Sequence, residues 1–387
     1  MKKIEKYWLI LFILENLSTQ YRPWFSWDMP ILILSFITAI IIVGVNFTSV
    51  VSFIAVKRYP FIYAFILVML LYQFTFGWMH INEKTWIYIF ARPLFAFAMI
   101  ISIKKNFDYY SKTFFIHLSY LCAGLILYGR FFVGGSIMHY GDTRLELGFG
   151  NPNTTSCVGA FSFCFLFTQI QKFNKKTLFV LGVCLYAVFV GGSRIAMLAV
   201  IVAIGFKYGF NLRTLKYFLY ALGVVFVLRF AGFQIIALDR LVTTVESDDM
   251  EADRAPEREA CWVQIMEHPI DGNGIAPPLS RAALQTSELG SHNGYLDMMK
   301  YFGIPFALII FFVLARESIK LFRLYFFQDD IVMKGHLLIC LIMLPSATVE
   351  CYFIGIHEYG TTLYYISYII LCMQQYKPHA QNNQLTA

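Results

Sequence analysis

The chain has 387 residues, of which 58% are hydrophobic and only 14% are charged. A soluble globular protein is usually about 45–50% apolar and about 25% charged. This composition therefore excludes an ordinary soluble enzyme, a disordered protein and a nucleic-acid-binding protein. The net charge of +7 comes from basic residues that lie in small groups between apolar runs, as in an integral membrane protein.

The apolar runs predict transmembrane helices, each of which needs about 20 mostly apolar residues. No small-residue cleavage site follows the first and weakest run, so we expect it to be retained rather than removed as a signal peptide. The sequence predicts an all-α, polytopic integral membrane protein with about 12 transmembrane helices. The runs are 7–18, 29–49, 59–79, 84–103, 112–130, 154–171, 176–192, 193–210, 214–231, 295–315, 335–354 and 358–375.

The distribution of basic residues sets the predicted orientation. With the N-terminus inside, the inner segments hold 19 Lys and Arg, whereas the short outer loops hold five. Cytoplasmic loops of membrane proteins carry such an excess of positive charge. We therefore expect both ends of the chain in the cytoplasm, which requires an even number of spans.

One predicted outer loop is far longer and more polar than the others. It covers 231–293 and separates 1–230, with transmembrane helices 1–9, from 294–387, with helices 10–12 and a short cytoplasmic tail. A structureless loop of about sixty residues would be unusual, so we expect a folded cap. The segment 253–257 has Pro and acidic residues suited to a first helical turn, and predicts a helix that ends near Glu267.

Basic residues on the predicted outer side are almost all arginines. The planar guanidinium grips phosphate or carboxylate with two hydrogen bonds, so this bias indicates an outward-facing site for a phosphate-bearing substrate. The alternative is that these arginines pair with the acidic residues of the loop. The set is Arg22, Arg130, Arg144, Arg194, Arg229, Arg240, Arg254, Arg258 and Arg281, beside Lys84.

Several of these positions have a context that suggests chemistry. Arg194 follows Gly191-Gly192 at a membrane boundary, where a charge is costly and marks a functional site unless it snorkels to the headgroups. Arg258 and Trp262 lie four residues apart on the predicted helix, so they share a face that could hold a diphosphate and a sugar. Trp262 could equally pack against the membrane rim.

His292 lies in Ser291-His292-Asn293-Gly294, just before a predicted span. Histidine suits a general base at neutral pH, although a lone loop histidine is more often a surface residue. Glu350 lies near the outer face and could line the same cavity. We interpret Asp248-Asp249 as a solvated turn and predict no metal site and no cofactor.

Taken together, these residues resemble the O-antigen ligase/O-antigen polymerase family of bacterial envelope glycosyltransferases. The order of the motifs within about 151–305, on one predicted membrane face, carries the resemblance; the rest of the chain matches only in its pattern of spans. The motifs are Gly192-Ser193-Arg194, Arg258-Glu259-Ala260-Cys261-Trp262, His268-Pro269-Ile270-Asp271-Gly272-Asn273-Gly274, Ser291-His292-Asn293-Gly294-Tyr295 and Gly303.

The resemblance implies a GT-C-like fold and a metal-independent, inverting glycosyl transfer at the outer face of the bacterial cytoplasmic membrane. The donor would be a glycan on undecaprenyl diphosphate. Arg194 and Arg258 would hold the diphosphate, and His292 would activate the acceptor hydroxyl. Further candidates from position are Arg144 and Arg281 for the diphosphate, and Trp262, Asn293 and Glu350 for sugar or cavity contacts.

Two activities of this family stay open. A polymerase joins lipid-linked repeat units into O-antigen or capsular polysaccharide, and we favour it slightly. A ligase transfers the finished glycan to lipid A-core or another acceptor. A flippase and a chain-length regulator are the protein partners expected from either activity. A lipid-linked sugar transporter is the rival from another class, but the charges gather at one face and the sequence has no internal repeat. A purely structural membrane scaffold is a third option, and nothing positive supports it.

Overall fold

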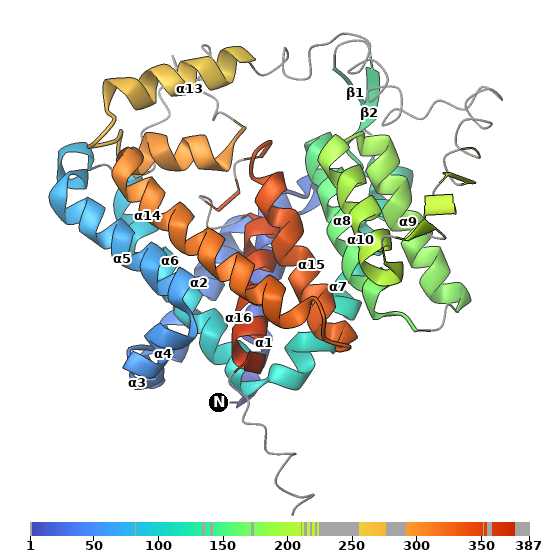
Figure 1. Ribbon diagram of the computed structural model, residues 1–387, viewed down its shortest axis with the longest axis horizontal. Coiled ribbons are helices and arrows are strands. Elements are labelled where there is room, and N and C mark those ends of the chain that lie inside the picture. Colours follow the sequence, from blue (N-terminus) through green and yellow to red (C-terminus); the bar gives the residue numbers. More distant parts are fainter. Residues whose placement is uncertain are drawn as a thin grey trace, which may run out of the picture.

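A computed structural model of the protein describes most of the chain (Figure 1). The described residues are 2–81, 83–133, 136–139, 142–171, 174–209, 211–212, 215–216, 219–220, 223, 255–275, 292–350, 352–353 and 358–375. Arg281 lies outside them, as do most of the predicted span 214–231 and most of the predicted outer loop.

The described chain is all-α apart from one hairpin, which confirms the predicted class. Strand β1 (Ser136–His139) pairs antiparallel with β2 (Asp142–Leu145). The α-helices are α1 (Lys2–Ser18), α2 (Asp28–Val45), α3 (Phe47–Val50), α4 (Phe53–Arg58), α5 (Pro60–Thr75), α6 (Glu83–Lys105), α7 (Phe114–Tyr128), α8 (Pro152–Gln169), α9 (Lys175–Gly191), α10 (Arg194–Tyr208), α13 (Ala255–Glu267), α14 (Gly294–Tyr325), α15 (Ile331–Ser346) and α16 (Tyr359–Gln375). Short 3₁₀ or π turns cover η1 (Arg22–Trp27), η2 (Gly77–His80), η3 (Tyr109–Thr113) and η4 (Gly129–Val133).

Every predicted apolar run except 214–231 overlaps one of these helices. Within the described chain, however, only four helical segments are both long and apolar enough to cross a membrane: Arg22–Val45, Thr85–Lys105, Tyr109–Val133 and Gly294–Tyr325. The apolar helices α5 and α15 are shorter than a full span. The total of twelve crossings stays a prediction.

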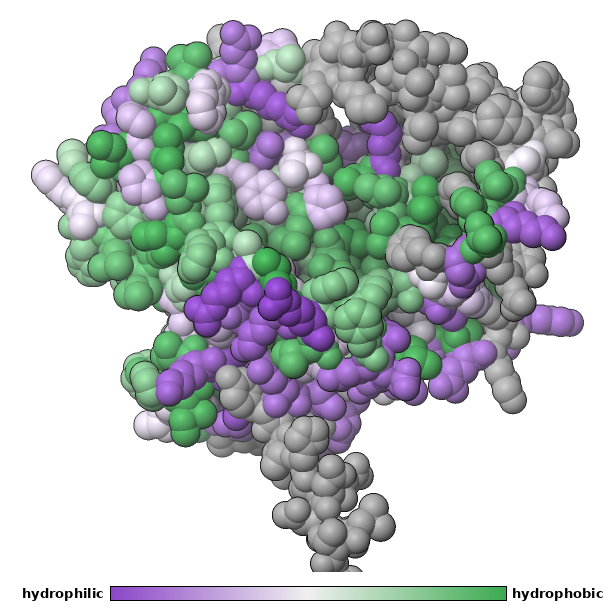
Figure 2. Space-filling view, in the orientation of Figure 1, coloured by the Kyte–Doolittle hydropathy of each residue, from purple (hydrophilic) through white to green (hydrophobic). Residues whose placement is uncertain are grey.

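Apolar side chains on the molecular surface agree with a membrane environment. On α2, Ile33, Leu34, Ile37, Ile40 and Ile41 are each at least half exposed and recur at helical spacing. Figure 2 shows hydrophobic residues gathered over much of the visible face. An apolar face of this extent is stable only against another apolar phase, such as lipid.

The core forms around α16, the helix at the centre of Figure 1. Residues 359–373 are buried without interruption, so α16 has no exposed stripe. A helix that is buried on all sides lies in the middle of a bundle. Its Tyr365 ring stacks on Phe61 of α5, and the Tyr368 hydroxyl accepts from the Phe61 backbone N–H. α16 therefore fixes the helices around it.

The long helix α14 has a sharp kink that the sequence did not predict. Gly303 has a φ of 74°, and Pro305 has no N–H to donate to the carbonyl of Tyr301. The turn 268–274 supplies the missing partners. The N–H of Gly274 donates to Tyr301 O at 3.2 Å, and the N–H of Ile304 donates outward to Pro269 O at 2.8 Å.

We predict that Gly303→Ala destabilises the protein by about 2–3 kcal/mol, because a side chain there is strained at positive φ. Its Cβ would also lie 2.3 Å from the carbonyl oxygen of Ile270. The measurement is thermal unfolding of the protein in detergent. Gly182→Ala in α9 is the matched control, since nothing lies within 4 Å of its Cβ position. Equal unfolding temperatures for the two variants would contradict a kink imposed by Gly303.

Candidate functional site

The segment that carries His292 has a demanding local geometry. The Asn293 side chain caps α14 by accepting from the backbone N–H groups of Tyr295 and Leu296 at 3.0 and 3.2 Å. A Cβ on Gly294 would lie 2.1 Å from the carbonyl oxygen of Tyr352, so only glycine fits. His292 itself has a φ of 48°, in the left-handed region. These contacts hold the histidine at the N-terminus of α14.

His292 and Glu350, both predicted from the sequence, line one cavity of about 200 Å³. The cavity lies between the connection from α15 to α16, the first turns of α8, and the end of α1. Its other lining residues are Gln20, Thr154, Cys157, Val158, Phe161, Tyr352, Glu358, Tyr359 and Gly360. Polar and titratable groups thus surround a space large enough for part of a sugar.

Three helices begin at this cavity. α8 contributes Thr154 in its first turn, α16 contributes Tyr359 and Gly360, and α14 starts two residues after His292. The aligned peptide dipoles give a helix N-terminus a partial positive charge. Their convergence favours an anionic group in or beside the cavity.

Helix α13, predicted from the first-turn residues of the large loop, is present and lies over the start of α14 (Figure 1). The Oε2 atom of Glu257 lies 3.7 Å from Nε2 of His292. The Arg258 guanidinium donates to the carbonyl oxygen of Thr348 at 3.1 Å, two residues before Glu350. Trp262 is 47% exposed, whereas Cys261 and Ile265 form the buried face. α13 therefore places the carboxylate of Glu257 and the guanidinium of Arg258 close to residues at the edge of the cavity.

Arg144 connects the hairpin to the same end of the bundle. It is 5% exposed, and its guanidinium donates to Gly191 O at 2.8 and 2.5 Å and to Oδ1 of Asn153 at 2.5 Å. Gly191 is the last residue of α9, and Asn153 is in the first turn of α8. Arg144 thus joins the ends of two helices next to the cavity.

Arg194 is the first residue of α10, directly after the predicted break in the apolar run. Gly192 adopts a left-handed φ of 67° at the end of α9, and the N–H of Ser193 donates to Ser156 Oγ at 3.2 Å. Gly191 must be glycine because a Cβ would lie 2.3 Å from that same hydroxyl. The half-buried Arg194 therefore begins a helix in close contact with α8, which lines the cavity.

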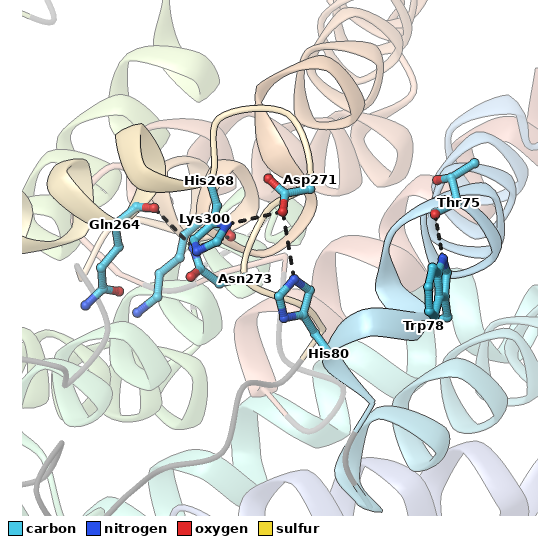
Figure 3. Close-up of polar contacts among 8 residues, drawn as sticks. All are labelled: Thr75, Trp78, His80, Gln264, His268, Asp271, Asn273 and Lys300. Atoms are coloured by element: carbon cyan, nitrogen blue, oxygen red, sulfur yellow. Dashed lines mark hydrogen bonds and ion pairs between the residues drawn. The ribbon is translucent and has the colours of Figure 1, made fainter.

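The motif 268–274 follows the C-terminal end of α13 and has a structural role at the α14 kink (Figure 3). The side chain of Asp271 lies 3.2 Å from Nδ1 of His268 and 4.0 Å from Nε2 of His80. The Asn273 side chain donates to the carbonyl oxygens of Gln264 and Lys300. This motif, one of those that carry the family resemblance, joins the segment after α13 to α14 and does not line the His292 cavity.

The residues that sequence reasoning missed are Glu257, Tyr352, Glu358 and Gln20. Glu358 accepts a hydrogen bond from Thr361 Oγ1 at 2.7 Å. Glu358 stands at the start of an apolar run, much as the His292 segment directly precedes one. That position in the sequence could have identified Glu358 as a candidate site residue. Glu257 gave no signal, because only the fold carries it to His292. Among the described residues, no group of three His, Cys, Asp or Glu lies close enough to hold a metal ion.

Comparison with known proteins adds no family assignment. No protein-family model matches the chain, and no curated protein shows significant sequence similarity to it.

Proposed function

We propose that the protein is a membrane glycosyltransferase that polymerises undecaprenyl-diphosphate-linked repeat units into O-antigen or capsular polysaccharide. The transfer is inverting and metal-independent. The observation that carries this proposal is the cavity that His292 and Glu350 share, at the meeting of three helix N-termini. The positive ends of the helices suit a diphosphate. The carboxylates of Glu350 and Glu358 and the side-chain amide of Gln20 suit sugar hydroxyls.

The proposed chemistry is a single displacement at the anomeric carbon of the donor. The acceptor hydroxyl oxygen forms a bond to that carbon while the bond to the diphosphate oxygen breaks. The acceptor's proton passes to Nδ1 of His292, whose other ring nitrogen faces Glu257. Arg194 and Arg258 stabilise the negative charge that develops on the departing lipid diphosphate.

Carboxylates line the cavity itself, whereas the arginines lie outside its lining, at neighbouring helix ends. This separation into an acidic side and a basic side supports distinct donor and acceptor positions. Arg144 and Arg194 lie where α9 meets α8 and α10, whereas Glu350 and Glu358 come from the connection between α15 and α16. We assign the lipid diphosphate to the basic side and the acceptor sugar to the acidic side. Trp262 and Asn293 are proposed to contact sugar.

The wider setting belongs to the same proposal. The enzyme would lie in the bacterial cytoplasmic membrane with about twelve spans in a GT-C-like arrangement, both chain ends inside and the cavity outside. Its partners would be the membrane lipid, a flippase that delivers the donor and a chain-length regulator. The runner-up is an O-antigen ligase with lipid A-core as acceptor, because the same donor site serves both activities.

The deciding experiment reconstitutes the purified protein with a lipid-diphosphate-linked repeat unit in excess chelator. A ladder of products on a gel supports the polymerase. Product only after adding a separate acceptor supports the ligase. No transfer in either assay would refute the proposal and favour a lipid-linked sugar transporter.

In that assay we predict that His292→Ala abolishes turnover, because no base remains to accept the hydroxyl proton. The variant should still insert and unfold at the wild-type temperature, since the imidazole is partly exposed. His117→Ala, on an exposed position of α7, is the control and should be fully active. Normal turnover by His292→Ala would contradict the role of base and would point to transport.

We predict that Arg194→Lys loses most of its activity although the charge is kept, because Lys cannot form the two-pronged hydrogen bond to a phosphate. The control is Arg130→Lys, an exposed position in η4. Initial transfer rates with saturating donor measure the effect. Full activity in Arg194→Lys would argue against diphosphate binding by this residue.

We predict that Glu257→Gln lowers kcat about tenfold with little change in KM. The lost carboxylate stabilises the positive charge that His292 gains during transfer. Glu259→Gln is the matched control, two residues along the same helix and exposed. If both variants, or neither, lost activity, the Glu257–His292 pair would have no specific role.

A further inference from the structure

The other end of α14 borders a second and larger cavity, of about 660 Å³. Its walls are one face of the C-terminal half of α14 and the last residue of α16. It shares no lining residue with the His292 cavity. The α14 residues that matter for its chemistry are Phe312, Arg316, Ile319, Lys320, Arg323 and Leu324.

Three cations line the cavity, and one fully buried acid of the same helix lies close to two of them. Arg316, Lys320 and Arg323 recur at spacings of four and three, so they lie on one face of the helix. The fully buried Glu317 lies 3.6 Å from Nε of Arg316 and 3.8 Å from Nζ of Lys320. Within the part of the chain that the structure describes, no carboxylate forms an ion pair with Arg323. Positive charge is therefore left over at the cavity.

The same helix face continues as apolar surface. Phe312 is 69% exposed and Ile319 is 54% exposed, and both line the cavity beside the cations. Figure 2 shows a hydrophilic patch over this part of the molecule, bordered by hydrophobic residues. An inorganic anion would satisfy the cations but leave this apolar surface uncovered. A ligand with both an anionic group and a long apolar chain covers both.

We propose that this cavity is a binding site for an anionic phospholipid of the surrounding bilayer. The headgroup phosphate binds Arg316, Lys320 and Arg323, and one acyl chain lies along Phe312 and Ile319. Basic clusters at helix ends attract anionic lipids in this way. The site stands apart from the proposed transfer reaction, and its test needs no enzymatic activity.

The experiment removes bound lipid in detergent and then adds phosphatidylglycerol or phosphatidylcholine with identical acyl chains. Native mass spectrometry counts the lipids retained by the intact protein. We expect phosphatidylglycerol to be retained about tenfold more strongly, and R316Q/K320Q/R323Q to lose that preference. The matched control K104Q/K175Q/K176Q removes three exposed cations from other helices and should keep it.

The triple variant leaves Glu317 buried without its partners, so it could unfold. Arg323→Gln avoids that problem, because Arg323 lies outside the Glu317 ion pairs, and it should weaken retention several-fold. Equal loss in the control variant would show general charge attraction and overturn the site. Displacement of the lipid by millimolar inorganic phosphate would show an anion site only, and would also overturn the proposal.

Discussion

The backbone hydrogen bonds between the turn 268–274 and the kink of α14 are the constraint on which the site depends. Lys300 and Tyr301 would normally accept from Ile304 and residue 305, but Gly303 breaks the helix and Pro305 has no N–H. A buried carbonyl without a hydrogen-bond partner costs about 1–3 kcal/mol. The turn removes that cost by donating from Asn273 at 2.8 Å and Gly274 at 3.2 Å. Because α13 directly precedes the turn, the same bonds hold α13 over the start of α14, where Glu257 meets His292.

The kink also divides α14 into a straight part of span length and a shorter part before it. The straight part after Gly303 has about 22 residues, which at 1.5 Å per residue is about 33 Å, close to the roughly 30 Å of a hydrocarbon core. The part before the kink is surplus to that thickness and runs beneath α13 (Figure 1). An unbroken helix of 32 residues would carry its N-terminus well beyond the membrane surface. The bend instead keeps His292 beside α8 and α16, whose N-termini share its cavity.

The sequence predicted the features that have local causes. Gly191-Gly192-Ser193-Arg194 contains its own helix break, because Gly192 adopts a left-handed conformation and Arg194 starts the next helix. The helix α13 followed from Pro and acids in its first turn. The kink at Gly303 was missed because transmembrane helices often contain Gly and Pro without a sharp bend. The positive φ of Gly303 and its contact with Ile270, which leaves no room for a Cβ, make glycine necessary, and both appear only in the folded structure.

Two residues show why the candidate site was only partly predictable. Arg144 was chosen as an outer arginine, yet its nearly buried guanidinium is held by the carbonyl of Gly191 and the amide of Asn153, which no local pattern indicates. Arg144 therefore fixes the positions of two helix ends beside the cavity. Glu257 was passed over as one acid among many in an acidic loop. Its proximity to His292 depends on the fold of 268–274, a segment that follows Glu257 by more than ten residues in the sequence.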